Sequence, residues 1–365
     1  MKKVAMFIDS LSGGGAEKVV MTLAQAMKNK GSKVTLFVLD NIVHYDIPPA
    51  LSLSVVYLQS NSKEKTKGWF NRNQQAQKLT ELVNKQIALY GQFDLFLVHL
   101  QESYRIVSAC DFSPVFYVVH NSLKETLERE KKLGPLKYFY LKSALKKLQG
   151  KHLITVSKGI ENELNHSSLF SPVSIQTIYN PFDFNEITLL ANKPEPSIPK
   201  DKYLIHVGRF ARQKRHDILF SALTKIPEDY KLVCLCRASG KLTALIQEYG
   251  LEERIIVTGF VQNPYPWIKN AKLLVLSSDY EGLPTVLIEA FACDTPVVST
   301  NCPHGPDEIM RGPHQQYLVP RRDPEQLAHK INQALNSNVK LAPPDILHQL
   351  EAENITQQYL DLAAN

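Results

Sequence analysis

Short apolar stretches alternate with amphipathic segments along most of this sequence. An apolar run ends at Ile8, and the segment Gly15–Met27 then carries an apolar stripe at the spacing of a helix, with Gly31 just beyond its end. Most of the apolar runs are continuous rather than alternating, which is typical of strands buried on both faces of a parallel sheet. Strands that alternate with helices in this way predict doubly wound α/β domains.

Two series of strands are predicted. The first comprises Lys3–Ile8, Lys33–Leu39, Leu53–Leu58, Asp94–Leu100, Val115–Val119 and His152–Val156. The second comprises Tyr203–Val207, Lys231–Cys236, Arg254–Val257, Lys272–Leu276 and Pro296–Ser299. Between them lie Pro194, Pro196 and Pro199, which exclude a helix or a central strand there.

We therefore predict a domain over residues 1–180, a linker over 181–200, a second domain over 201–345, and a terminal helix over 346–365 that packs back across the domains. Ligands of this fold class bind at the carboxyl ends of parallel strands. We expect the functional site in a cleft that the two domains face.

The composition is that of an ordinary globular protein. The chain has 365 residues, of which 44% are hydrophobic and 21% charged, so a disordered or fibrous protein is excluded. No apolar run approaches the roughly 20 residues that span a bilayer. The cysteines are odd in number and lack the spacing of zinc ligands, which indicates buried free thiols in a cytoplasmic protein. They are Cys110, Cys234, Cys236, Cys293 and Cys302.

The formal net charge of +6 is concentrated in one segment. Residues Lys124–Lys151 hold nine Lys and Arg against three Asp and Glu, so the rest of the chain is balanced. A nucleic-acid-binding protein would spread basic residues over a reading face, so no nucleic-acid partner is expected. Lys142 and Lys146, with Phe139 among them, are predicted on the outer face of a helix. They suit an anionic membrane surface, although charged runs are usually a solvated helix face.

A glycine-rich loop joins the first strand to its helix. Gly13, Gly14 and Gly15 let the backbone approach a ligand and turn its amides toward an anion at the helix N-terminus. The alternative is a simple tight turn. A dinucleotide fingerprint requires a third glycine where Lys18 stands, so a nicotinamide site is disfavoured, although Asp40 after the second strand is compatible with one.

Two cations follow the first strand of the second domain. Arg209 leaves the strand end, and Lys214 lies just before the next helix. Across such a turn the two can converge on one diphosphate, Arg as a planar fork and Lys as a point charge. A solvated turn is the alternative, but the position at a carboxyl-end loop favours the diphosphate.

The stretch from Ser277 to Ala290 carries the most chemical information. A strand ends there, and Pro284 fits the first position of a helix, so the free amides of Leu283, Thr285 and Val286 form a phosphate site.

Two carboxylates flank this helix start. Glu289 shares a helix face with Thr285 and can accept both ribose hydroxyls of a nucleotide whose diphosphate caps the helix. Glu281 precedes the helix and can reach the group beyond the diphosphate. A carboxylate in an apolar helix is costly without such partners. A salt-bridged Glu289 is the alternative.

These residues resemble a known family. Glu281 and Glu289, with seven residues between them, look like the E-x7-E motif of the retaining GT-B glycosyltransferases of family 4, also called group 1. The other matching landmarks are Gly13–Glu17, Gly208–Arg209 with Lys214, and Asn301–Ile309. The resemblance spans nearly the whole chain. It implies two Rossmann-like domains, of which the N-terminal one binds the acceptor and the C-terminal one binds a nucleotide-sugar.

The resemblance also implies roles for single residues. In the C-terminal domain, Arg209 and Lys214 neutralise the donor diphosphate, Glu289 binds the ribose and Glu281 holds sugar hydroxyls. Leu283 and Thr285 contribute backbone amides.

Further roles lie in both domains. Gly14 and Gly15 close on the phosphates. Val261 lies in the region that holds the base by backbone contacts. His120 matches the histidine beside the transferred sugar, whereas the residues alone fit a satisfied strand-end histidine equally well. The family usually has a Gly-x-Gly turn where this chain has Arg237–Gly240, so the role of that loop is open.

The run Cys302–Glu308 resembles a subgroup that builds bacterial surface polysaccharide, lipopolysaccharide and lipid-linked oligosaccharide, generally from UDP-sugars. The implied activity is retaining transfer of a hexose or N-acetylhexosamine from a UDP-sugar to a saccharide acceptor. The implied location is cytoplasmic or peripheral on the inner face of the cytoplasmic membrane. The sequence holds no Asp-x-Asp, and no metal is expected. The alternatives are a sugar-nucleotide epimerase, a noncatalytic sugar-nucleotide-binding protein and a nicotinamide dehydrogenase.

Overall fold

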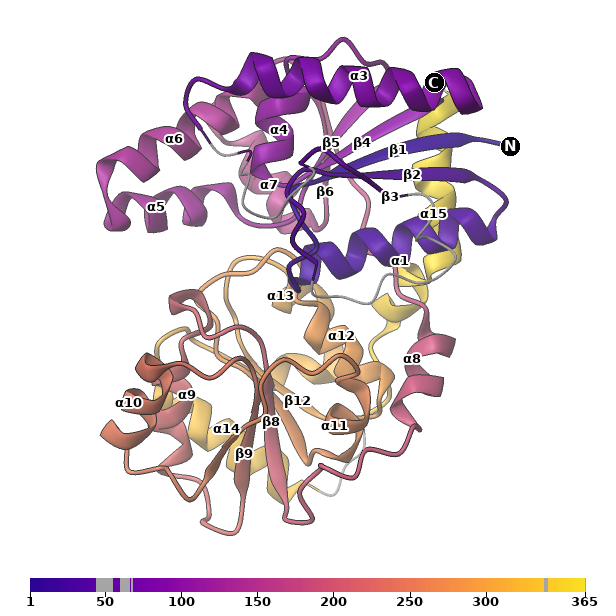
Figure 1. Ribbon diagram of the computed structural model, residues 1–365. Coiled ribbons are helices and arrows are strands. Elements are labelled where there is room, and N and C mark those ends of the chain that lie inside the picture. The colour runs from indigo at the N-terminus through magenta and orange to yellow at the C-terminus, as the bar shows by residue number, and fades with distance from the viewer. Residues whose placement is uncertain (44–54, 60–65, 67, 338–340, 365) are drawn as a thin grey trace. The chain divides into compact units, whose positions relative to one another are not determined.

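The computed structural model describes residues 1–43, 55–59, 66, 68–337 and 341–364. The chain divides into two compact units (Figure 1). The N-terminal unit comprises Met1–Phe182 and Leu350–Asn365, and the C-terminal unit comprises Asp183–Gln349.

The N-terminal unit is built on a seven-stranded parallel sheet with the order β3-β2-β1-β4-β5-β6-β7. Its strands are β1 Lys3–Ile8, β2 Lys33–Val38, β3 Val55–Tyr57, β4 Leu95–His99, β5 Val115–Val119, β6 His152–Thr155 and β7 Ser174–Thr177. Its helices are α1 Gly15–Asn29, α3 Arg72–Tyr90, α4 Gln101–Val107, α5 Leu123–Leu133, α6 Pro135–Leu145, α7 Lys158–Asn165 and α15 Ala352–Asp361.

The C-terminal unit is built on a six-stranded parallel sheet with the order β10-β9-β8-β11-β12-β13. Its strands are β8 Tyr203–Val207, β9 Lys231–Leu235, β10 Ile255–Val257, β11 Leu273–Leu276, β12 Val297–Thr300 and β13 Leu318–Val319. Its helices are α8 Phe184–Ala191, α9 His216–Leu223, α10 Gly240–Glu248, α11 Tyr265–Asn270, α12 Thr285–Ala292, α13 Pro306–Ile309 and α14 Pro324–Asn336.

These two parallel sheets confirm the predicted fold class. The central strands are apolar because both faces of each sheet are covered: all residues of β4 and β11 are buried. In both sheets the strand order reverses beside the first strand of the unit, between β1 and β4 and between β8 and β11. In folds of this class, ligands bind at such a switch point, at the carboxyl ends of the strands.

Several elements differ from the prediction. The predicted linker 181–200 contains helix α8, whose Ile187 and Ala191 are buried. Two short strands, β7 and β13, were not predicted. The predicted strand Leu53–Leu58 begins outside the described residues, which show only Val55–Tyr57 of it as β3.

The chain's last segment also differs from its prediction. It is not one helix: a 3₁₀ segment, Asp345–Leu350, precedes α15. Helix α15 packs beside α1 within the N-terminal unit (Figure 1).

Candidate active site

In the C-terminal unit, an ion pair joins the loop after β8 to the loop after β11, the two strands between which the strand order reverses. Lys214 lies in the short 3₁₀ helix Arg212–Lys214 after β8, and Glu281 lies in the loop after β11. The Nζ atom of Lys214 is 2.7 Å from Oε1 of Glu281, and the two side chains are only 18% and 10% exposed. Gly208 leaves room for this lysine, since a Cβ there would lie 3.2 Å from its Cε. The sequence predicted both residues for the site but not their contact.

Hydrogen bonds to backbone carbonyls hold these two loops together. The Ser277 hydroxyl donates to the Lys214 carbonyl at 2.7 Å, and the Asp279 amide donates to the Gln213 carbonyl at 2.8 Å. The Gln213 side-chain amide donates to the Tyr280 carbonyl at 2.7 Å. The backbone that carries the lysine and the glutamate is therefore fixed on both sides of the ion pair.

The loop after β12 packs against the loop that carries Glu281. The Glu281 amide donates to the Pro303 carbonyl at 2.6 Å, and the His304 amide donates to the Glu281 carbonyl at 3.3 Å. Gly305 has φ +97° and lies so close to Pro284 that a Cβ would come within 2.5 Å of the proline Cδ. Only glycine permits this approach.

We call the Lys214–Glu281 ion pair and the three loops around it the corner. Helix α12 begins directly after the loop that carries Glu281, and the amides of its N-terminus face the corner. Pro284 is its N-cap rather than its first residue, and no side chain caps the helix. Helix α10, after β9, has a different N-terminus, because the Ser239 hydroxyl accepts a hydrogen bond from the Leu242 amide at 3.3 Å. The free amides and the helix dipole of α12 are thus available to an anion.

The other predicted residues of the C-terminal unit lie on α12, just before it, or in the loops after β8 and β10. Glu289 is 4% exposed, four residues after Thr285 on α12, and Leu283 is buried. Arg209 is exposed and has no ion pair among the described residues. Val261 is half-buried after β10.

The loop that departs from the family pattern carries an exposed cation. The Arg237 guanidinium lies 5.9 Å from the centroid of the Phe260 ring, and that ring is 40% exposed. The Gly-x-Gly turn of the family is therefore replaced by a cation and an aromatic surface.

The glycine loop of the N-terminal unit already holds an anion. Gly14 is the N-cap of α1, but the Glu17 carboxylate fills the space that a Cβ at Gly14 would need. The Ser12 hydroxyl donates to that carboxylate at 3.2 Å. A phosphate at Gly14 and Gly15 therefore requires the Glu17 side chain to move away.

His120 follows β5 and contacts a second histidine, His99, at the end of β4. Burial lowers the pKa of His120 to about 4, so the ring is neutral at physiological pH. His99 was not among the predicted site residues, although it ends β4 and His120 directly follows β5, two strands that the βα pattern makes adjacent.

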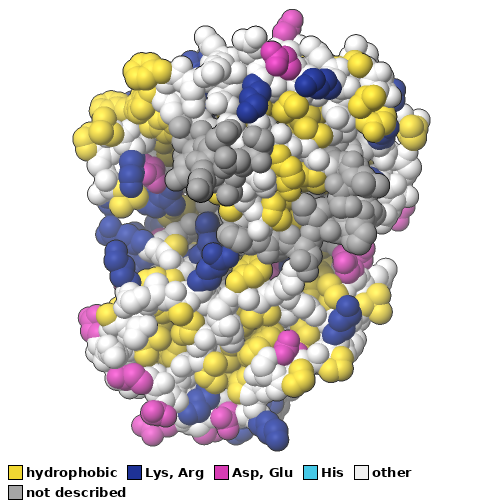
Figure 2. All heavy atoms as spheres, in the orientation of Figure 1, with side chains coloured by type: hydrophobic (Ala, Val, Ile, Leu, Met, Phe, Trp, Pro, Cys, Tyr) yellow, Lys and Arg dark blue, Asp and Glu magenta, His cyan; other side chains and the backbone are white. Residues whose placement is uncertain are grey.

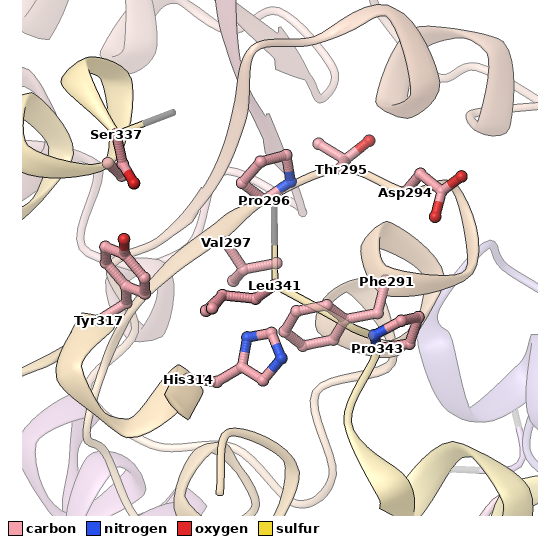
Figure 3. A pocket seen from close by; sticks show the side chains of 11 residues that line it. Phe291, Asp294, Thr295, Pro296, Val297, His314, Tyr317, Ser337, Leu341 and Pro343 are labelled. Atoms are coloured by element: carbon pink, nitrogen blue, oxygen red, sulfur yellow. The ribbon is translucent and has the colours of Figure 1, made fainter. Parts of the chain in front are cut away.

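A separate pocket opens at the amino end of β12 (Figure 3). Phe291 and His314 stack edge to face in its wall, with ring centroids 4.7 Å apart. The Nε2 atom of His314 donates to the Ala342 carbonyl at 2.8 Å. None of the predicted site residues lines this pocket, and it lies at the other end of the strand from the ion pair, so we assign it no part in the site.

The fold is shared with a protein of known structure. The Anabaena protein Alr3699/HepE, solved in complex with UDP and glucose, matches with a TM-score of 0.78 at 18% sequence identity, and the match covers 100% of both chains. Two parallel-sheet α/β units of this kind define the GT-B class of glycosyltransferases.

Two protein families, one for each half of the sequence, together match most of the chain. Residues 13–186 match "Glycosyltransferase Family 4", and residues 191–347 match "Glycosyl transferases group 1". The chain belongs to this family of glycosyltransferases and is an enzyme, as the E-x7-E motif and the other matching sequence motifs predicted.

Named relatives build bacterial glycans. The sequence is 29% identical over 325 residues to the N-acetylgalactosamine-N,N'-diacetylbacillosaminyl-diphospho-undecaprenol 4-alpha-N-acetylgalactosaminyltransferase of Campylobacter jejuni, covering 85% of this chain and 83% of the relative. It is 29% identical over 196 residues to the lipopolysaccharide 1,6-galactosyltransferase of Salmonella typhimurium, which is 51% of this chain and about half (53%) of that relative.

Proposed function

We propose that this glycosyltransferase moves a hexose or N-acetylhexosamine from a UDP-sugar to a saccharide acceptor of lipopolysaccharide, capsule or lipid-linked oligosaccharide, with retention at the anomeric carbon. The observation that carries the proposal is the corner made by the Lys214–Glu281 ion pair and the uncapped N-terminus of α12. It offers a cation and backbone amides to a diphosphate, and a carboxylate to sugar hydroxyls.

In this proposal the protein's own groups stabilise the leaving diphosphate. As the bond between the anomeric carbon and the phosphate oxygen breaks, negative charge grows on that oxygen, where Lys214, Arg209 and the α12 amides attract it. The acceptor hydroxyl attacks from the same face, and its proton passes to the leaving phosphate oxygen. Glu289 holds the ribose. Glu281 and His120 hold the transferred sugar.

The relatives support the choice of substrates. The Campylobacter relative is named for an α-linked product on a diphospho-undecaprenol acceptor, and Alr3699/HepE was solved with UDP and glucose. The first supports a lipid-linked acceptor for this chain, and the second supports a UDP-sugar donor.

Incubation with UDP-glucose, UDP-galactose and their two N-acetyl counterparts, without acceptor, tests the proposal. We expect slow release of UDP from one donor and, by NMR, the α anomer as the first sugar product. The rate should persist in excess EDTA because protein groups replace a metal. Inversion at C2 would identify an epimerase. Tight binding without any turnover, even when saccharide acceptors are added, would identify a binding protein.

We also propose that the enzyme docks on the inner face of the cytoplasmic membrane through α5 and α6. Three apolar side chains at the junction of these helices, Leu133, Leu136 and Phe139, are 54%, 75% and 57% exposed. Figure 2 shows hydrophobic side chains at the surface over α6, at the upper left. The opposite side of the segment is buried, as predicted, through Leu141, Ala144, Leu145 and Leu148. No helix among the described residues is long and apolar enough to cross a bilayer.

Charge reversal in this segment is expected to abolish flotation with anionic liposomes. Each lysine near an anionic leaflet contributes about 1 kcal/mol, so replacing Lys142, Lys146 and Lys147 with Glu removes about 3 kcal/mol of attraction and adds repulsion. The measurement is co-flotation with vesicles in which the fraction of phosphatidylglycerol, an anionic lipid, is raised from none to about 40%.

A control variant makes the same charge change elsewhere. It carries Glu at Lys193, Lys200 and Lys241, three exposed lysines of the C-terminal unit, and should float like wild type. Equal flotation of both variants, or none by wild type at low salt, contradicts the membrane proposal and leaves the transferase proposal untouched.

A further inference from the structure

Two histidine rings meet at the carboxyl ends of β4 and β5. These strands are neighbours in the sheet, with His99 opposite Val118, so the residue after β5 lies beside the last residue of β4. The Nδ1 atom of His99 is 2.9 Å from the Nε2 atom of His120. His99 is fully buried, with 0% exposure.

Both imidazole rings are neutral at physiological pH. Burial lowers the pKa of His120 to about 4, and burial together with the neighbouring His120 holds the pKa of His99 well below its usual range. Two neutral imidazoles that face each other at this distance share one proton, so one ring donates and the other accepts.

The second nitrogen of His99 decides which ring donates. Its Nε2 atom is buried and has no hydrogen-bond partner among the described residues. If His120 donated, the His99 proton would sit on that Nε2 atom as a buried N–H without an acceptor. If His99 donates from Nδ1, its Nε2 atom is only an unused lone pair. Unpaired N–H groups are the rarer case in protein interiors, so His99 is the donor.

We propose that His99 is a positioning residue that holds His120 as the Nδ1–H tautomer, so that His120 presents an N–H donor to an oxygen of the transferred sugar. The Nε2 atom of His120 accepts the hydrogen bond from His99, which leaves the His120 proton on Nδ1. The Nδ1 atom has no hydrogen-bond partner among the described residues, but His120 is only half-buried, so an N–H there is open to solvent or a ligand, unlike an N–H on the buried Nε2 atom of His99. The sugar contact rests on the proposed function, whereas the tautomer does not.

NMR of the full chain with ¹⁵N-labelled histidine tests the tautomer directly. Couplings between ring nitrogens and ring hydrogens distinguish the Nδ1–H form from the Nε2–H form, and the H120Q variant assigns the His120 signals. We expect Nδ1–H in wild type. H99N keeps an amide donor near the Nδ1 position and should preserve this form, whereas H99L should release His120 to a mixture of both tautomers.

Kinetics provide the second readout. Loss of the fixed N–H donor in H99L should lower kcat about tenfold, and H99N should recover most of the loss. The affinity for free UDP, which lacks the transferred sugar, should stay unchanged. The control is H152L, because His152 begins the next strand and bonds Ser174, 2.8 Å away, rather than His120. It should alter neither the tautomer nor kcat.

The two proposals fail in different ways. An Nε2–H form of His120 in wild type, or an unchanged tautomer in H99L, overturns the role of His99 whatever the enzyme's activity. Equal kcat in H99L and wild type overturns the donor contact. A wild-type protein that neither hydrolyses nor transfers any UDP-sugar overturns the proposed function, and the NMR result still stands.

Discussion

Replacing Lys214 with alanine is expected to lower kcat about 10²- to 10³-fold, the usual cost of losing one group that stabilises transition-state charge. The ammonium group is held beside the loop after β11 by its ion pair with Glu281, so it is already in place when charge develops on the leaving phosphate. Arg209 is exposed and free of ion pairs among the described residues, so R209A should lose turnover by a similar mechanism with less effect on folding.

Loss of folding has to be separated from loss of the phosphate contact, because K214A leaves the Glu281 carboxylate unpaired. Affinities for UDP and uridine provide the separation. K214A should weaken UDP binding and leave uridine binding unchanged. The matched control is K202A: Lys202 also pairs with a carboxylate, Asp229 at 3.2 Å, but precedes β8 at its amino end. Wild-type kcat in K214A, or activity restored only by added Mg²⁺, contradicts the assignment.

The sequence predicted most of the fold because the apolar strands are continuous. All five strands predicted for the C-terminal unit are present, each within two residues of its predicted ends. The missed strands β7 and β13 are short, and β7, Ser174–Thr177, has only one strongly apolar residue and lies at the sheet edge. Helix α8 was hidden by the prolines that follow it. Its apolar side packs on α11 and α12, contacts that local sequence does not encode.

The candidate site was predicted less completely, for a physical reason. Motifs identify residues near one another in sequence, such as Leu283, Thr285 and Glu289 on one helix. The contact between Lys214 and Glu281 joins positions 67 residues apart and depends on β8 and β11 being neighbours. The Glu17 carboxylate at the glycine loop depends on a side-chain rotamer. Neither has a signature in a single sequence.

Replacing Glu289 with glutamine is expected to weaken UDP binding about 10- to 100-fold. A carboxylate accepts both ribose hydroxyls, whereas an amide offers one acceptor and turns a donor toward the second hydroxyl. Loss of hydrogen bonds to a charged group costs about 1.5–3 kcal/mol, which corresponds to this range of dissociation constants. Glu289 is buried on α12, near the helix end that we assign to the diphosphate, so little solvent competes for these bonds.

The ligand provides the control for this variant, since a buried substitution also perturbs packing. If Glu289 holds the ribose, wild type should bind 2′-deoxy-UDP more weakly than UDP, and E289Q should bind the two with nearly equal affinity. A general loss of packing would instead weaken both ligands by the same factor and preserve their ratio. Calorimetric titration of both nucleotides into both proteins measures the coupling between the carboxylate and the 2′-hydroxyl. A coupling of zero, or an unchanged affinity of E289Q for UDP, rules out the ribose contact, because a carboxylate that binds the hydroxyl must lose that preference when it becomes an amide.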